Sequence, residues 1–140
     1  MDAAAQEQLR ARLVGAVCRA IEHRGNHLQC RLDARLLVVN AMWRLSHEGT
    51  IVATSDAEDA DLDAIPALVG GQTVRDATCR GEYNDLRLEF DGGTVLEVFT
   101  DSEKYEGWNL LGGFNDAIIA GPGRNWAVWP VAGDEGGDED

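Results

Sequence analysis

A chain of 140 residues with 44% hydrophobic residues is long enough and apolar enough to bury a core as one domain. Its 25 acidic and 12 basic residues give a net charge of −13, which disfavours nucleic acid and anionic lipid as partners and favours a basic one. Apolar runs fall short of the roughly 18 residues of a membrane span, and the acidic N-terminus lacks the apolar centre of a secretory signal, so we expect a cytoplasmic protein.

The chain begins with residues that favour a helix. The segment up to Leu13 is rich in Ala, Gln, Glu, Leu and Arg, and Asp2 is placed to cap its N-terminus. The triplet Leu-Val-Gly at 13–15 recurs at 68–70, where it precedes a strand-like segment. We therefore expect the first helix to end near Leu13 and a strand to run from Ala16 to His23.

The clearest strand pattern lies in residues 84–99. Apolar and charged residues alternate from Leu86 to Phe90, the triplet Asp-Gly-Gly at 91–93 interrupts them, and an apolar-rich run follows. Asp-Gly favours a tight turn, because the turn needs positive φ angles that Gly adopts freely. This segment therefore predicts a β-hairpin, and a weaker copy of the same pattern lies in residues 28–40.

The two hairpins belong to a longer internal similarity with a period of about 55 residues. We expect two related halves, 13–54 and 68–121, each a β-meander of about five strands preceded by a short helix. The second helix is predicted over residues 60–68, with Pro66 near one end. Matched tryptophans, Trp43 and Trp108, should pack in the core. The expected fold class is α+β, mainly antiparallel β-sheet, with both helices on one face of the sheet.

The end of the chain changes in composition. Residues 125–130 predict a last strand, in which Trp126 and Trp129 should point to opposite faces, so that one of them is less buried. Gly, Asp and Glu dominate after Val131, and five of the acidic residues lie in 133–140. Such a segment buries too little apolar area to order itself, so we expect one domain over residues 1–132 and a disordered acidic tail over 133–140.

The second half contains an insertion that the first half lacks, residues 100–107, immediately before the second matched tryptophan. Inserted loops often carry function. An acidic loop with an aromatic side chain suits entry into a basic cleft, with the charges setting the association rate and a buried aromatic adding affinity; an ordinary solvated loop is the alternative. The candidate partner-binding residues are Asp101, Glu103, Tyr105, Glu106, Trp108 and Asp85.

Motifs for metal binding or catalysis are not recognisable. His23, His27 and Cys30 flank a turn, but their spacing matches no standard zinc pattern, so solvated histidines are favoured over a metal site. Ser, His and Glu at 46–48 are consecutive, and neighbouring side chains of an extended segment point to opposite faces, which prevents a proton relay. We expect no catalytic residue, no metal and no cofactor.

The motifs together resemble a known family. The Leu-Val-Gly triplets, the Asp-Gly-Gly hairpin, the run Tyr105–Leu110 and the run Ile119–Trp129 are similar to small bacterial domains of unknown function, whose relatives include immunity proteins of polymorphic toxin systems. The similarity covers most of residues 13–129 and is clearest after Leu68. This family has no catalytic signature to transfer, so the resemblance implies a non-enzymatic binding protein that neutralises a toxin by occlusion.

Charge and resemblance together predict an acidic immunity protein that covers the active or substrate-binding site of a cognate bacterial toxin. The toxin would be basic and act on nucleic acid or nucleotides, while the immunity protein itself would bind neither nucleic acid nor membrane. Acidity that serves solubility alone is the other explanation of the charge. Two other function classes stay open: a structural or self-associating module, and a small-molecule-binding domain with a cleft between the halves. The oligomeric state is left open.

Overall fold

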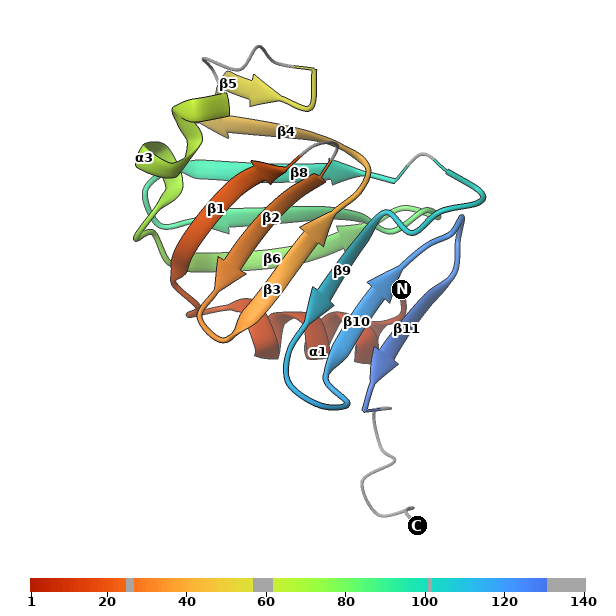
Figure 1. Ribbon diagram of the computed structural model, residues 1–140. Coiled ribbons are helices and arrows are strands. Elements are labelled where there is room, and N and C mark those ends of the chain that lie inside the picture. Colours follow the sequence, from red (N-terminus) through yellow and green to blue (C-terminus); the bar gives the residue numbers. More distant parts are fainter. Residues whose placement is uncertain (25–26, 57–61, 101, 131–140) are drawn as a thin grey trace.

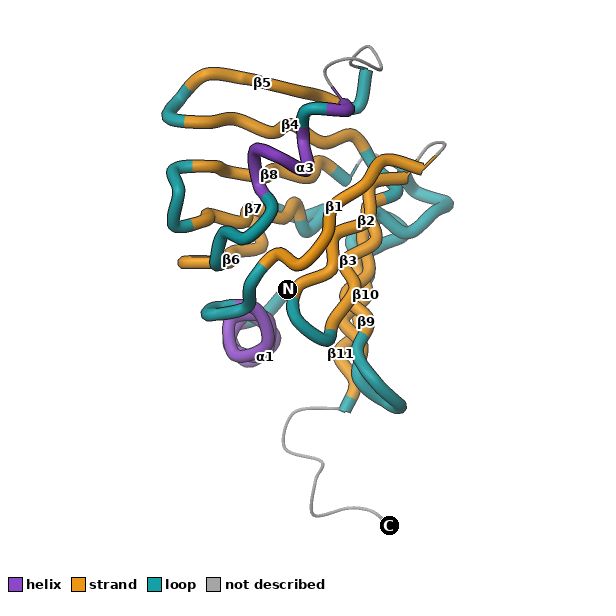
Figure 2. The backbone as a smooth tube through the Cα atoms, turned by 60° about the vertical axis from the view of Figure 1, so that its left-hand side comes forward, coloured by secondary structure: helices purple, strands orange, loops and turns teal. Residues whose placement is uncertain are grey.

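The computed structural model describes residues 1–24, 27–56, 62–100 and 102–130. These residues form two antiparallel β-sheets that face each other, with short helices at their margins (Figures 1 and 2). The α+β class with mainly antiparallel sheet is thus confirmed. The predicted tail over 133–140 lies outside the described residues. Within the described segments, no helix has the length and apolar character that crossing a bilayer requires.

The larger sheet, which we call the large sheet, consists of β1 (Cys18–Arg24), β2 (His27–Leu32), β3 (Arg35–Val39), β9 (Trp108–Leu111), β10 (Ala117–Ala120) and β11 (Trp126–Trp129). The small sheet consists of β4 (Met42–His47), β5 (Thr50–Thr54), β6 (Val74–Arg80), β7 (Asp85–Phe90) and β8 (Thr94–Phe99). The helices are α1 (Ala3–Leu13) and α3 (Ile65–Val69).

The boundaries that depend on local signals agree with expectation. The Asp2 side chain accepts a hydrogen bond from the Ala5 backbone N–H at 2.8 Å and caps α1, which ends at Leu13. Pro66 lies in the first turn of α3, where its missing N–H costs no helical hydrogen bond. The first strand begins at Cys18, two residues later than expected from Ala16, because Gly15 has a φ of +93° and turns the chain after the helix.

Each sheet combines strands from both halves of the chain. The large sheet has the order β1-β2-β3-β9-β10-β11 and the small sheet the order β5-β4-β8-β7-β6. The first three strands of each half therefore form a meander in one sheet, and the next two cross to the other sheet. This differs from the expected meander of five strands in each half. The crossing gives the apolar face of each half a partner, because each sheet covers the other.

The helices follow the same exchange. Helix α1 leads into β1 but packs along β6, and α3 precedes β6 but packs along β1. The expectation that both helices cover one face of one sheet is therefore wrong. Since β1 and β6 are the first strands of the two halves and edge strands of different sheets, each helix packs against the first strand of the other half.

One continuous core lies between the two sheets. Alternate residues of each strand are buried in it, for example Leu86, Leu88 and Phe90 of β7. Trp43 is the second residue of β4 and Trp108 is the first residue of β9, the two strands that follow a crossing. They are 2% and 0% exposed, which confirms that both are core residues. The core is thus assembled from the inner faces of both sheets.

Candidate functional site

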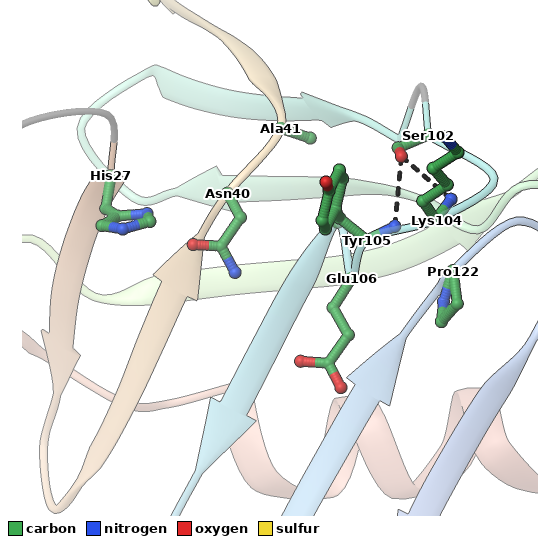
Figure 3. A pocket seen from close by; sticks show the side chains of 9 residues that line it. His27, Asn40, Ala41, Ser102, Lys104, Tyr105, Glu106 and Pro122 are labelled. Atoms are coloured by element: carbon green, nitrogen blue, oxygen red, sulfur yellow. Dashed lines mark hydrogen bonds between the residues drawn. The ribbon is translucent and has the colours of Figure 1, made fainter.

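Residues 102–107 of the inserted loop lie at one end of the sandwich and are held in place by hydrogen bonds. The Ser102 hydroxyl accepts from the backbone N–H groups of Lys104 at 3.0 Å and Tyr105 at 3.1 Å, as Figure 3 shows. Gly107 accepts from the Asn40 backbone N–H at 2.9 Å and so ties the loop to the link between β3 and β4. These bonds give the loop a defined shape before any partner binds.

A hollow of about 670 Å³ opens beside the loop. Its lining comes from both halves of the chain: His27, Asn40, Ala41, Ser102, Lys104, Tyr105, Glu106, Gly107 and Pro122. In Figure 3 the Tyr105 side chain lies between Asn40 and Pro122, and the Glu106 carboxylate points away from Lys104. The imidazole, amide, phenol, ammonium and carboxylate groups offer both donors and acceptors to a polar ligand or to a partner's side chains.

The loop exposes the residue types that the sequence analysis singled out. Tyr105 is 72% exposed, and Glu103 and Glu106 are also exposed. Glu106 Oε1 accepts a hydrogen bond from Asn109 Nδ2 at 2.8 Å, which connects the loop to β9. Asp101, the remaining acid of the expected site, lies outside the described residues. The described part of the loop therefore exposes one aromatic ring, two carboxylates and the ammonium group of Lys104.

Two of the predicted partner-binding residues, Trp108 and Asp85, make contacts inside the protein. Trp108 is 0% exposed and its indole N–H donates to the Asn84 carbonyl at 2.9 Å, so the prediction that it contacts a partner is wrong. Asp85 Oδ1 accepts from the backbone N–H of Thr100 at 2.9 Å and from its hydroxyl at 3.1 Å. This carboxylate holds the start of the loop, and the Thr100 hydroxyl also donates to the Tyr83 carbonyl.

Asn84 supports the site and was missed in the sequence. It is 0% exposed, its Oδ1 accepts from the Met1 amino group at 2.7 Å, and its Nδ2 donates to the carbonyls of Arg124 at 3.2 Å and Asn125 at 3.3 Å. Its φ of +60° is one that Asn tolerates better than most residues. An Asn between a Gly turn and a strand is the signal that was available. Asn84 thus joins three segments next to the loop.

The last strand carries two exposed aromatic residues. Trp126 is 37% and Trp129 is 47% exposed, so Trp129 is the less buried of the two, as expected, although both are exposed. Trp129 lies on the outer side of the edge strand β11 and Trp126 on the other side, and both residues line a hollow of about 330 Å³ against the start of α1. An edge strand has a neighbour on one side only, which leaves both rings partly open.

The titratable groups that chemistry would use are buried or unclustered. Among the described residues, no group of three or more His, Cys, Asp or Glu is arranged to hold a metal ion. The Cys18 and Cys30 sulfurs lie 3.6 Å apart in the core, where the contact with Cys18 and burial raise the pKa of Cys30 well above its usual value. Burial raises the pKa of Cys79 to about 12. The raised pKa values make Cys30 and Cys79 poor nucleophiles at neutral pH.

Comparison with known proteins gives one family match. Residues 17–130, more than half of the chain, match the model of a family of unknown function (DUF6188). No curated protein and no solved structure matches the chain. The match covers every strand of both sheets, and α1 lies outside it.

Proposed function

The chain belongs to the DUF6188 family, and on that premise we propose that it is a non-enzymatic immunity protein that neutralises a cognate bacterial toxin. It does so by covering the active or substrate-binding site of the toxin. The observation that carries this proposal is the exposed ring of Tyr105 between the exposed carboxylates of Glu103 and Glu106, on a loop anchored at both ends. The family description names no activity, so the proposal rests on these residues.

The physical argument is one of preorganisation and charge. Because Ser102 and Asp85 already hold the loop, binding costs little further conformational entropy. The net charge of −13 attracts a basic partner over several ångströms and raises the association rate at low salt. A basic cleft that binds phosphate groups would accept the two carboxylates in their place. We therefore infer a toxin that acts on nucleic acid or nucleotides.

Growth rescue tests this proposal. The chain is co-expressed with the toxin-like product of the adjoining gene, and cells carrying the triple variant Glu103→Lys, Tyr105→Ala and Glu106→Lys are expected to lose protection. The matched control reverses two exposed acids elsewhere, Glu7→Lys and Asp63→Lys, and should protect as the native chain does. Full protection by the loop variant, with an unchanged association rate, would overturn the proposal.

A second candidate function is favoured by the hollow beside the loop, which is lined from both halves of the chain. Its donors and acceptors suit a small polar molecule. A ligand that binds only the folded chain raises the melting temperature in proportion to the logarithm of its concentration. A panel of nucleotides and amino acids would be screened for such a rise, and Asn40→Ala should abolish it. A panel without effect at millimolar concentration argues against this function.

We also infer that the two halves are copies of one unit, which the strand pairing supports. The Val17 carbonyl accepts from the Asp33 backbone N–H at 2.9 Å, and the Thr73 carbonyl accepts from that of Asp91 at 2.8 Å. In return the Asp33 carboxylate accepts from the Val17 N–H at 3.2 Å and the Asp91 carboxylate from the Thr73 N–H at 3.0 Å. Val17 and Thr73 themselves form an isolated bridge where the halves meet.

A fragment would test the duplication. If the halves are equivalent, β6, β7 and β8 of one copy of residues 62–130 can accept β9 and β10 from a second copy. This fragment alone is then expected to form a symmetric dimer with mostly antiparallel sheet. Sedimentation and circular dichroism would detect it, and a folded monomer would contradict the equivalence.

A further inference from the structure

The outer face of the large sheet carries an apolar patch. On β3, β9, β10 and β11, the residues that alternate with buried ones point away from the core, and in the described part of the chain no helix or strand covers this side (Figure 2). All but one of these outward positions are apolar, Asn109 being the exception. The members of the apolar patch are Leu36, Val38, Leu111, Ala117, Ile119, Ala127 and Trp129.

Strand register makes the patch continuous. Leu111 lies opposite Leu36 on one side and opposite Ala117 on the other, and Ala117 lies opposite Trp129. This row crosses all four strands without a polar residue. Leu111 is 38% exposed, Trp129 is 47% exposed, and Phe114 at the tip of the β9–β10 hairpin is fully exposed at 103%. Contiguous exposed apolar surface of this kind marks a site of interaction.

The small sheet shows that an outer face of this protein need not be apolar. On its outer face Glu97 pairs with Arg44 at 2.9 Å and with Arg87 at 3.3 Å, and Glu89 pairs with Arg87 at 3.3 Å and Arg75 at 3.2 Å. We call these residues the charge ladder. Its charges satisfy one another and leave that face well hydrated. The small sheet exposes single apolar side chains on β4 and β5, such as Met42 at 52% and Ile51 at 56%, but the charge ladder crosses the middle of its outer face.

The margin of the patch carries Glu106 on one side and Arg31, opposite Leu36, on the other, so the net charge of the whole chain indicates which partner covers it. Glu106 is exposed and its carboxylate contacts the amide of Asn109, so the acidic loop borders the patch directly. A second copy would bring together two chains of net charge −13, which repel each other. A basic partner protein meets no such repulsion.

We propose that the apolar patch is the docking surface for the basic partner protein. Apolar side chains of the partner cover Leu111, Ile119 and Trp129, and a Lys or Arg at the edge of that contact meets Glu106. Four strands and four residues along each strand span about 250 Å² in projection, whereas a stable interface buries about 800 Å² per partner. The patch is thus the apolar centre of the contact, and the loop is its rim. This inference rests on the proposed function, because it extends the same partner contact from the loop onto the sheet.

A peptide probe tests the surface without the toxin. A synthetic 14-residue amphipathic peptide of Leu and Lys is titrated into the full chain, with a Leu and Glu peptide of the same pattern as its counterpart. Methyl NMR is expected to show shifts for Leu36, Val38, Leu111 and Ile119 with the Lys peptide only. Shifts that centre on the charge ladder, or binding of the Glu peptide with equal affinity, would overturn the proposal.

Matched variants separate the two faces. Leu111→Ser and Ile119→Ser should each weaken binding of the Lys peptide about five- to tenfold. Val95→Ser removes an outward apolar residue of β8, between Glu89 and Ser46 in register, and should leave the affinity unchanged. Melting temperatures show whether each variant is folded, and Leu111→Ser, at a more exposed position, serves if Ile119→Ser unfolds. Equal affinity of folded Leu111→Ser and the native chain would sink the proposal.

Two further outcomes are informative. Concentration-dependent dimerisation of the native chain that Leu111→Ser abolishes would assign the patch to a second copy and overturn the basic partner. Loss of toxin neutralisation in the loop variant, together with no effect of Leu111→Ser on peptide binding or on neutralisation, would leave the proposed function standing and reject this surface. The two proposals therefore fail separately.

Discussion

The two sheets share one core but differ in the chemistry at the middle of their outer faces. The outer face of the small sheet is crossed by the charge ladder, in which Glu97 and Glu89 each contact two arginines. The outer face of the large sheet carries the apolar patch, which no helix or strand of the described residues covers. Solvated ion pairs add little stability but keep a sheet face soluble. The comparison indicates that the charge ladder suits contact with water, whereas the apolar patch suits contact with another molecule.

The largest effect is expected from tryptophans on the two sides of the large sheet. Trp108→Ala empties a fully buried position and should lower the free energy of unfolding by about 3–5 kcal/mol. Trp129→Ala, on the outer side and 47% exposed, should lower it by only about 1–2 kcal/mol, because less of its surface is buried. Urea unfolding measures both. A large loss of stability in Trp129→Ala would mean that the patch is structural and would break the comparison.

A smaller loss is expected at Asn84, which supports the loop end of the sandwich. Asn84→Ala leaves the Met1 amino group and two carbonyls without their partner, at a cost of about 2 kcal/mol. Asn84→Gly loses the same bonds but accommodates the positive φ, so it should be less destabilised than the alanine variant. Thermal unfolding compares the two. Equal stability of both variants would show that backbone strain contributes nothing here.

Converting the charge ladder sharpens the contrast between the faces. The double variant Arg87→Leu and Glu97→Leu makes the small sheet apolar, and its stability should change by less than about 1 kcal/mol because the lost pairs are partly exposed. Self-association should increase, as sedimentation velocity would show. The control Glu82→Leu and Arg124→Leu removes an exposed ion pair from loops and should stay monomeric if the native chain is monomeric. An unchanged sedimentation coefficient in the ladder variant would contradict the role given to its charges.

The smallest effect concerns pH. Hydrogen bonds from Arg75 and Arg87 lower the pKa of Glu89, so its charged form is favoured in the folded chain. Its contribution to stability is then fully present above the ordinary carboxyl pKa of about 4.3, and it is lost as the pH falls through the lowered pKa of the folded state. Glu89→Gln should be less stable than the native chain by under about 1 kcal/mol at pH 7. Unfolding curves should show this difference closing in acid; a difference independent of pH would contradict the linkage.

Local features of the fold could be predicted from the sequence because local chemistry determines them. The cap at Asp2, the end of α1 at Leu13 and the turn at 91–93 each depend on residues within one turn of the chain. The crossing of strands between the sheets depends on how the buried faces of strands far apart in the sequence pack against each other. An alternating pattern shows that one face of a strand is buried, but it does not show in which sheet the strand lies.

Register within the apparent copies shows the same limit. The triplets at 13–15 and 68–70 suggested that Gly15 corresponds to Gly70. In the structure Gly15 and Gly71 have the equivalent backbone, with φ angles of +93° and +85°. The backbone conformation after each helix determines this correspondence. The identical Leu-Val-Gly triplets place it one residue too early, at Gly70.

The candidate site was predicted in part. Tyr105, Glu103 and Glu106 were found because an inserted acidic loop is visible in the sequence, whereas Trp108 was assigned to the same surface only by adjacency. Its burial follows from its position as the first residue of β9, opposite Val39 of the core. The apolar patch was missed because outward apolar residues look like core residues until the sheet order is known. Only the pairing of β3 with β9 brings Leu36 beside Leu111.

The exchange of strands between the sheets also determines when the chain can fold on the ribosome. The large sheet pairs β3 with β9, whose residues Val39 and Trp108 are far apart in sequence, so it cannot close until most of the chain has left the exit tunnel. Until then the apolar faces of β1, β2 and β3 are open to solvent. High contact order of this kind slows folding to milliseconds or longer, which lengthens the time for which these apolar faces stay exposed.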